Sequence, residues 1–163
     1  MARLVLVDAS PIIGLTRVNG LSWLGQLFSN VWVPQEVRRE VLSGRGGDDE
    51  LQILEAERCG YISLWPESAP TQPKLPDLDE GEAACVRIAL QQKVASLILI
   101  DDRMGRVVAR EHGLKVAGTA AVIGMAKLKG LITSARVVFE ELHSSDFRIS
   151  AEVIREVLDR VQE

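Results

Sequence analysis

The sequence predicts an α/β protein with three layers, α/β/α, around a central, mostly parallel sheet of about four to five strands. Short apolar runs alternate with segments of helical spacing along most of the chain, which is the order typical of a parallel sheet covered by helices. Two runs, residues 4–7 (LVLV) and 97–100 (LILI), are wholly apolar, as expected of strands buried on both faces. A length of 163 residues fits one domain. We therefore predict a single domain over 1–163, with C-terminal helices from about residue 133.

The N-terminal half is predicted to hold three strands, the first being 4–7. Ser10 and Pro11 match the preferences for the cap and first turn of a helix, and leucines continue at helical spacing as far as Phe28. The next elements follow in chain order: strand 31–33, helix 35–42, loop 43–47, a helix around 51–56 that ends near Gly60, and strand 61–65.

Residues 66–78 carry four prolines and are predicted to form an extended connector within the domain, because neither side alone completes an α/β pattern. The elements expected beyond it are a helix to about Gln92, strand 96–100, a helix to Arg110, strand 115–118, a helix that Thr119 caps and Gly130 ends, and two helices over 133–143 and 150–161.

Composition restricts the classes of protein. Nineteen basic against 23 acidic residues give a net charge of −4, which argues against coating nucleic acid by bulk charge but leaves a nuclease with an acidic metal site open. Aromatic residues are only 4%, so base-stacking platforms are not expected. The two histidines and two isolated cysteines lack the spacing of a zinc site.

The N-terminal apolar run is too short for a signal peptide or a membrane span, and no other stretch reaches about 18 uninterrupted apolar residues. Cys59 and Cys85 are expected to be reduced thiols. Together these features predict a cytoplasmic protein with no membrane partner.

Carboxylates follow two of the predicted strands. Asp8 ends the first, and Asp101 with Asp102 ends the strand at 96–100. Ligands of open α/β sheets bind beyond the carboxyl ends of the strands, where converging carboxylates must be neutralised by cations or by protons. Oxygen ligands without His or Cys suit Mg²⁺ or Mn²⁺. The strand ends therefore predict a divalent-metal site.

Each acid also has a purely structural interpretation. Asp8 could mark the entry to the first helix, although Ser10 already fits that position. Glu40 shares a helix face with Glu36, and such a face can simply be solvated. Glu82 stands three residues after Asp79, the spacing of a capping box. Asp102 could equally cap the helix that begins at residue 103.

Arg103, Arg106 and Arg110 recur at helical spacing and share one helix face. A solvated face explains them without chemistry. Because arginine matches the geometry of phosphate, we alternatively predict that Arg103 and Arg106 contact phosphate groups beside the metal site.

The chain resembles the PIN-domain superfamily, and within it the VapC-like prokaryotic proteins. The resemblance rests on VDASPII, VPQEVRREV, LDEGEAACVRIAL and LILIDDRMGRVVAREHGLKVAGT, while HSSDFRISAEVIREVL is similar to the C-terminal end of one PIN subgroup. These motifs cover most of the chain. Their order and spacing, rather than any single motif, carry the resemblance.

The resemblance implies a Rossmann-like parallel sheet that carries metal-binding acidic residues. It also implies that the protein acts on RNA. The implied metal ligands are Asp8, Glu40, Glu82 and Asp102, with Asp101 alongside. The first four are also the implied catalytic residues. Ser10 matches a position where the family often has a supporting hydroxyl near the metal. Glu82 stands where many relatives have Asp. The implied cofactor is Mg²⁺ or Mn²⁺. The implied partners are an RNA substrate, a small antitoxin protein and a second copy of the chain in a homodimer.

Two rival functions remain open at this point. The leading hypothesis is a metal-dependent endoribonuclease, the toxin of a toxin–antitoxin pair. The alternative is a non-catalytic PIN-like module that binds RNA or protein. A phospho-accepting receiver module fits less well, because its paired acids would follow the first strand rather than the strand at 96–100.

Overall fold

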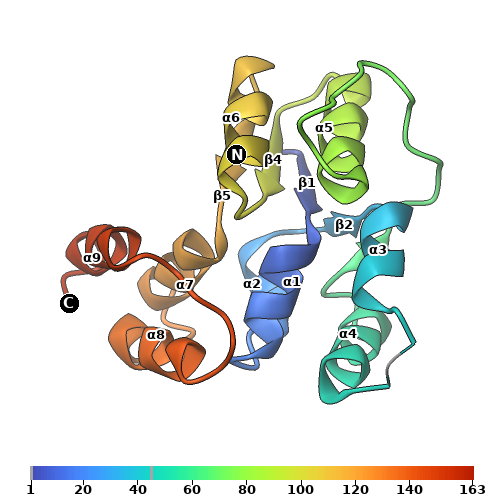
Figure 1. Ribbon diagram of the computed structural model, residues 1–163. Helices are drawn as coiled ribbons and strands as arrows, with labels where there is room; N and C mark the ends of the chain where they lie inside the picture. The colour runs from blue at the N-terminus through green and yellow to red at the C-terminus, as the bar shows by residue number, and fades with distance from the viewer. Residues whose placement is uncertain (1, 45) are drawn as a thin grey trace.

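The computed structural model describes residues 2–44 and 46–163, and it confirms the predicted fold class (Figure 1). Within those residues one sheet contains five strands, all parallel, in the order β3-β2-β1-β4-β5. The strands are β1 (Leu4–Val7), β2 (Val31–Val33), β3 (Ser63–Leu64), β4 (Ser96–Leu99) and β5 (Lys115–Ala117). Helices cover the sheet to give three layers. Part of the predicted loop 43–47, Arg45, lies outside the described residues.

The order of the strands places β1 in the middle of the sheet. Val5 of β1 pairs with Val31 of β2, and Leu6 of β1 pairs with Ile98 of β4. The chain builds outward from β1 through β2 to β3 and then crosses to the other side for β4 and β5. The topological switch point therefore lies between β1 and β4, which is where open α/β sheets bind ligands.

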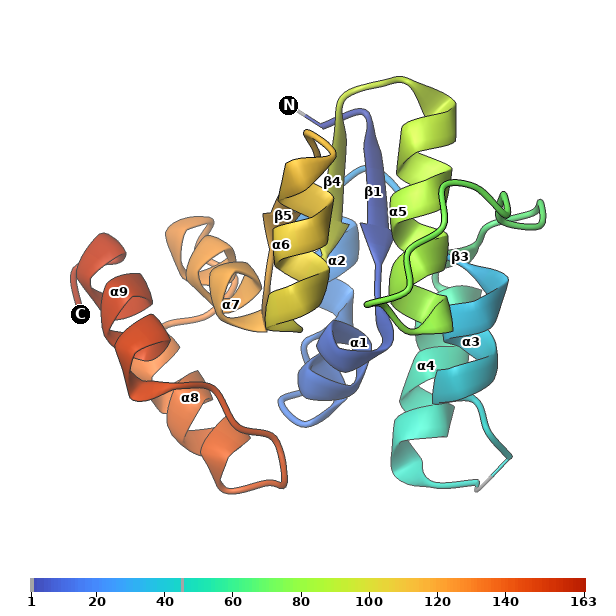
Figure 2. The same cartoon turned by 45° about the horizontal axis from the view of Figure 1, so that its top comes forward.

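The helices of the described residues are α1 (Ala9–Thr16), α2 (Leu21–Leu27), α3 (Gln35–Val41), α4 (Asp48–Arg58), α5 (Glu80–Gln92), α6 (Arg103–Glu111), α7 (Thr119–Leu128), α8 (Ala135–His143) and α9 (Ala151–Arg160). Helix α5 packs against β1 and β4, and α6 packs against β5 and α5; Figure 2 shows both alongside these strands. Helices α1, α2 and α7 pack against one another.

The core is largely aliphatic, with Trp23, Trp65 and Phe139 among its buried residues. Every residue of β1 is buried. Because successive strand residues point to opposite faces, this burial shows that both faces of β1 are covered. Ile12 of α1 and Ile88 of α5 are fully buried with Leu6.

The predicted helical run from Ser10 to Phe28 is two helices, not one. Asn19 takes a left-handed conformation with φ of 53°, which asparagine tolerates better than most residues. The backbone N–H of Gly20 then donates to the carbonyl of Leu15 at 2.8 Å, closing the turn between α1 and α2. Apolar residues continue at a spacing of three across this turn, through Leu15, Val18 and Leu21, so periodicity alone does not reveal it.

Two predicted caps were wrong. Helix α1 begins at Ala9 with Asp8 in the N-cap position, so Ser10 lies inside the first turn. Helix α7 likewise begins at Thr119, and Gly118 occupies its N-cap position. Both hydroxyls donate to Asp101 instead. The third strand is also shorter than predicted, because the N–H of Tyr61 bonds to Ala56 at the end of α4.

The C-terminal helices α8 and α9 pack on α7 rather than on the sheet, at the opposite side from α3 and α4 (Figure 1). Ser134 and Ser150 cap them through side-chain hydrogen bonds. No helix in the described ranges is long and apolar enough to cross a membrane.

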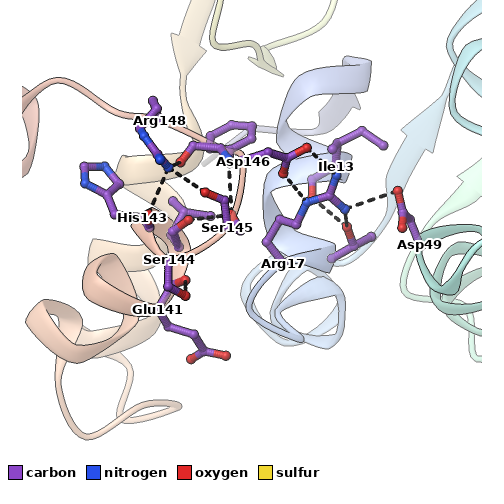
Figure 3. Close-up of polar contacts among 12 residues, drawn as sticks. Ile13, Arg17, Asp49, Glu141, His143, Ser144, Ser145, Asp146 and Arg148 are labelled. Carbon is purple, nitrogen blue, oxygen red and sulfur yellow. Dashed lines mark hydrogen bonds and ion pairs between the residues drawn. The ribbon is translucent and has the colours of Figure 1, made fainter.

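The segment between α8 and α9 is tied to the rest of the molecule (Figure 3). Arg17, at the C-cap position of α1, donates from Nε to Asp146 Oδ1 at 2.7 Å, and its Nη1 lies 3.1 Å from Asp49 Oδ2 in α4. Nη1 of Arg148 donates to the carbonyls of His143, Ser145 and Phe147. These contacts fix the path of the chain toward α9.

Candidate metal-binding site

The two predicted strand ends meet at the switch point of the sheet. Val7 of β1 pairs with Leu99 of β4, and the N–H of Asp8 donates to the carbonyl of Leu99 at 2.9 Å. Asp8 therefore leaves the sheet beside the strand that leads to Asp101 and Asp102. The sheet register itself explains why these distant parts of the sequence come together.

A cavity of about 320 Å³ opens at this point, and we call it the acidic cavity. It is lined by Asp8, Ala9, Ser10, Glu40, Asp79, Glu82, Asp101 and Asp102. The structure thus brings together all five predicted acids and Ser10. The arrangement concentrates six carboxylates from separate elements around one opening.

Asp8 is buried with only 5% of its surface exposed. Its Oδ1 accepts no hydrogen bond from any described residue, and although Asp8 occupies the N-cap position of α1, its side chain makes no capping bond there. Burial raises the pKa of Asp8 to about 7, the N–H of Ala9 opposes the shift, and nearby Asp79, Glu40 and Asp101 add to it. A buried oxygen of this kind calls for a proton or a cation.

Glu82 divides its two oxygens between two roles. Oε1 accepts from the N–H of Asp79 at 3.1 Å, while Asp79 Oδ1 accepts from the N–H of Glu82 at 2.8 Å, which completes a capping box at the start of α5. Oε2 is buried and has no hydrogen-bond partner within the described part of the chain. Burial raises the pKa of Glu82 to about 8, partly opposed by its hydrogen bond to Asp79. Glu82 therefore forms the capping box through Oε1, and its Oε2 is left for a ligand.

Glu40 and Asp79 complete the open side of the cavity. Glu40 is exposed at the end of α3, and its pKa is raised, first by partial burial and then by the charge of Asp79. Asp79 was not among the predicted site residues. Its capping-box spacing explained it fully as a helix start, and nothing in the sequence indicated that its carboxylate also lines the cavity.

Asp101 and Asp102 differ in their hydrogen bonding. Oδ1 of Asp101 accepts from the N–H of Thr119 at 2.7 Å, and Oδ2 accepts from Thr119 Oγ1 at 2.7 Å and from Ser10 Oγ at 3.0 Å. Asp102 caps α6 through Oδ2, which accepts from the N–H of Gly105 at 2.9 Å. Asp101 therefore connects β4 to α1 and α7, whereas Asp102 has a more exposed carboxylate.

Two glycines allow the backbone to approach the buried carboxylates. A Cβ on Gly105 would lie 2.6 Å from Glu82 Oε2, and a Cβ on Gly81 would lie 3.1 Å from Asp8 Oδ1. A larger residue at either position would press on one of the buried oxygens.

The two predicted arginines, Arg103 and Arg106, lie in different environments in the structure. Arg103 is exposed and is not in the lining of the acidic cavity. Arg106 is half-buried and lines a second cavity that also contains Asp101. Helical spacing placed both on one face, but only Arg106 lies toward the carboxyl ends of the strands.

The donor set fits a hard divalent cation. It consists of oxygens, and two of them, Asp8 Oδ1 and Glu82 Oε2, are buried in the acidic cavity; oxygen ligands of this kind suit Mg²⁺ or Mn²⁺. Across the described residues, no three acidic, histidine or cysteine side chains are already gathered as a closed metal cage. Like charges repel, so a cation would have to draw these carboxylates together.

Comparison with known proteins gives the family. A family model described as a PIN domain matches residues 4–163, and the chain therefore belongs to the PIN-domain family. PIN domains are generally nucleases, a class of hydrolase, and PIN nucleases usually use divalent metals. No curated protein and no solved structure matches the chain.

Proposed function

We propose that this PIN domain is a metal-dependent endoribonuclease, the toxin of a VapC-like toxin–antitoxin pair. The observation that carries the proposal is the pair of buried oxygens, Asp8 Oδ1 and Glu82 Oε2, in the lining of one acidic cavity at the switch point of the sheet. Burying two carboxylates without compensation is costly. A cation-binding role explains why the fold keeps them.

Asp8 and Glu82 would hold Mg²⁺ or Mn²⁺ through these buried oxygens, with Glu40 and Asp102 as further ligands, directly or through water. Asp79 adds negative charge beside them. We assign Asp101 mainly a positioning role, because three hydrogen bonds from Ser10 and Thr119 already engage its oxygens. Ser10 supports the site through that contact.

The metal would supply a Lewis acid and an activated water for hydrolysis of an RNA phosphodiester. The chain contributes the fixed positions of the ligands. Asp8 is held by β1 and its backbone bond to Leu99, and Glu82 is held by its capping box. Such preorganisation keeps the charges aimed at one point when the substrate phosphate enters.

The partners belong to the same proposal. A small antitoxin would inactivate the enzyme by covering the acidic cavity, and a basic side chain of that partner would complement its carboxylates. We also propose a homodimer and a cytoplasmic location.

The test is cleavage of a labelled single-stranded RNA by the parent protein and by Asp8→Asn, with Mg²⁺ or Mn²⁺ and with EDTA. Asp48→Asn is a matched control, because Asp48 is an exposed carboxylate on α4 that is not in the lining of the acidic cavity. We expect cleavage by the parent and the control with metal, and at least a hundredfold slower cleavage by Asp8→Asn.

Cleavage that survives EDTA, or equal rates for the parent and Asp8→Asn, would refute the metal-dependent mechanism. RNA binding without cleavage, unchanged by Asp8→Asn, would instead identify the alternative function, a non-catalytic module.

A further inference from the structure

A second cavity of about 320 Å³ lies beside the acidic cavity, and we call it the arginine cavity. Its walls come from α6, the first turn of α7, the segment before α9, and α9 itself. Asp101 lines both cavities. The two openings therefore share a wall at the end of β4.

Arg106 provides the most buried positive charge in the arginine cavity. Its Nε is buried, and no described residue supplies an acceptor for it. A Cβ on Gly118 would lie 3.3 Å from Arg106 Nη1 and 2.8 Å from Asp101 Oδ1, so the glycine allows both groups to approach the start of α7. A buried guanidinium N–H without an acceptor calls for one, and an anion suits it.

Two further arginines line the same cavity. Arg160 is exposed on α9, and Arg148 precedes α9 with its Nη1 held by three backbone carbonyls. Together with Arg106 they outnumber the two carboxylates of the lining, Asp101 and Glu156, by three to two. The cavity is thus locally positive in a chain whose net charge is −4.

The first turn of α7 adds backbone donors. Ala120 and Ala121 line the cavity. The N–H of Thr119 donates to Asp101, but Gly118 at the N-cap has no side chain that could occupy the N–H groups of Ala120 and Ala121. Helix N-termini attract anions through such N–H groups. Here they reinforce the charge of the arginines.

We propose that the arginine cavity is a phosphate-binding subsite that holds a backbone phosphate of the RNA strand next to the phosphodiester at the acidic cavity. This inference rests on the proposed function for the identity of the ligand. The C-terminal helix α9 is then part of the substrate site, and the anchoring of its preceding segment by Arg17 and Arg148 keeps that wall in place (Figure 3).

The first experiment uses inorganic phosphate and needs no activity. Phosphate is titrated into the full-length ¹⁵N-labelled protein, and the amide signals of Ala120 and Ala121 are followed by NMR. We expect both signals to shift in the parent and in Arg155→Gln, a control on α9 outside the cavity lining, but to stay in place in Arg106→Gln and Arg160→Gln. Arg160 is exposed, so its variant keeps the test valid even if Arg106→Gln fails to fold. No shift in the parent, or equal shifts in all variants, would overturn the subsite.

The second experiment measures binding of a labelled single-stranded RNA in EDTA, where metal-dependent cleavage is prevented. We expect Arg106→Gln and Arg160→Gln each to weaken binding about tenfold and to reduce the salt dependence by about 0.7 in log–log slope, the value for one lost phosphate contact on a single strand; Arg155→Gln should bind as the parent does. Unchanged RNA binding alongside the expected phosphate shifts would mean that the cavity takes a free phosphate, which overturns the RNA assignment. If the parent did not cleave RNA with metal, the proposed ribonuclease function would be refuted. The phosphate-binding subsite would not be, because the phosphate titration tests it separately.

Discussion

Gly105 in α6 lies so close to Glu82 in α5, which lines the acidic cavity, that a side chain on Gly105 would collide with the Glu82 carboxylate. A Cβ on Gly105 would lie 2.6 Å from Glu82 Oε2 and 2.5 Å from Cδ1 of Ile100. The absence of a side chain at residue 105 therefore sets where the buried Glu82 oxygen lies.

Gly105→Ala is expected to displace Glu82 Oε2 and to weaken metal binding. Overpacking of this kind costs about 1–3 kcal/mol. We expect a lower Tm in the absence of metal and a smaller rise in Tm on adding Mg²⁺, both measured by thermal unfolding. Gly124→Ala is the matched control, since its Cβ would lie 2.9 Å from Val157 Cγ1, away from the acidic cavity. A full response of Gly105→Ala to Mg²⁺ would contradict the role of this contact.

Asp8→Asn is expected to stabilise the metal-free protein at pH 8. The charged carboxylate is buried, and its Oδ1 accepts no hydrogen bond from the part of the chain that the structure describes, so a neutral amide removes an unfavourable desolvation. The same change should abolish the stabilisation by Mg²⁺. The parent should gain about 2.7 kcal/mol at a metal concentration of 100 times Kd, which corresponds to a rise in Tm of about 5–10 °C for a chain of this size.

Asp146→Asn provides the control of opposite sign. Asp146 accepts from Arg17 at 2.7 Å, and this hydrogen bond lowers the pKa of Asp146. Its loss should reduce Tm slightly and leave the Mg²⁺ response intact. If both variants lowered Tm equally at pH 8, burial of the Asp8 charge would not be the cause.

Much of the fold could be predicted because wholly apolar strands and their order imply a parallel sheet. The carboxylates at the ends of two strands could also be predicted, but the meeting of Asp8 with Asp101 and Asp102 depends on β1 and β4 being neighbours in the sheet, which the structure shows. Glu40 could be proposed only from the resemblance to PIN domains, because a solvated helix face explained it equally well.

Other features depend on three-dimensional packing. Ser10 and Thr119 matched helix-cap preferences, but Asp101 competes for both hydroxyls. Asp79 both caps α5 and lines the acidic cavity. Arg103 and Arg106 share one face of α6, and they differ in the parts of the protein that surround each side chain. The spacing of residues along a helix carries no information about those surroundings.

Thr119→Val is expected to destabilise the protein, because it removes the hydrogen bond from Oγ1 to Asp101 and keeps the side-chain volume. Thr119 is fully buried. A hydrogen bond to a charged group contributes about 1.5–3 kcal/mol, and urea unfolding should show a loss in this range. Thr119→Ser retains the hydroxyl and should lose less stability.

Ser10→Ala removes the third donor to Asp101, and its effect on stability should not add to that of Thr119→Val, since both substitutions act on one carboxylate. Strict additivity would show that the two bonds are independent.

The metal-free protein should lose stability as the pH rises. The pKa values of Asp8 and Glu82 are raised by burial from 3.8 and 4.5 to about 7 and about 8, so the folded state binds more protons than the unfolded state between these values. The contribution of these groups is fully present below about pH 4 and is lost as the pH passes 7 and 8.

Thermal unfolding in EDTA between pH 5 and pH 9 measures this dependence. One pKa unit corresponds to about 1.4 kcal/mol, and we expect these two groups together to lower Tm by about 10 °C or more across the range. Mg²⁺ should reverse most of the loss at pH 9 and have little effect at pH 5, because it competes with protons for the same oxygens. Asp8→Asn should flatten the profile. A Tm in EDTA that stayed constant or rose toward pH 9 would show that the two carboxylates are not held protonated in the folded protein.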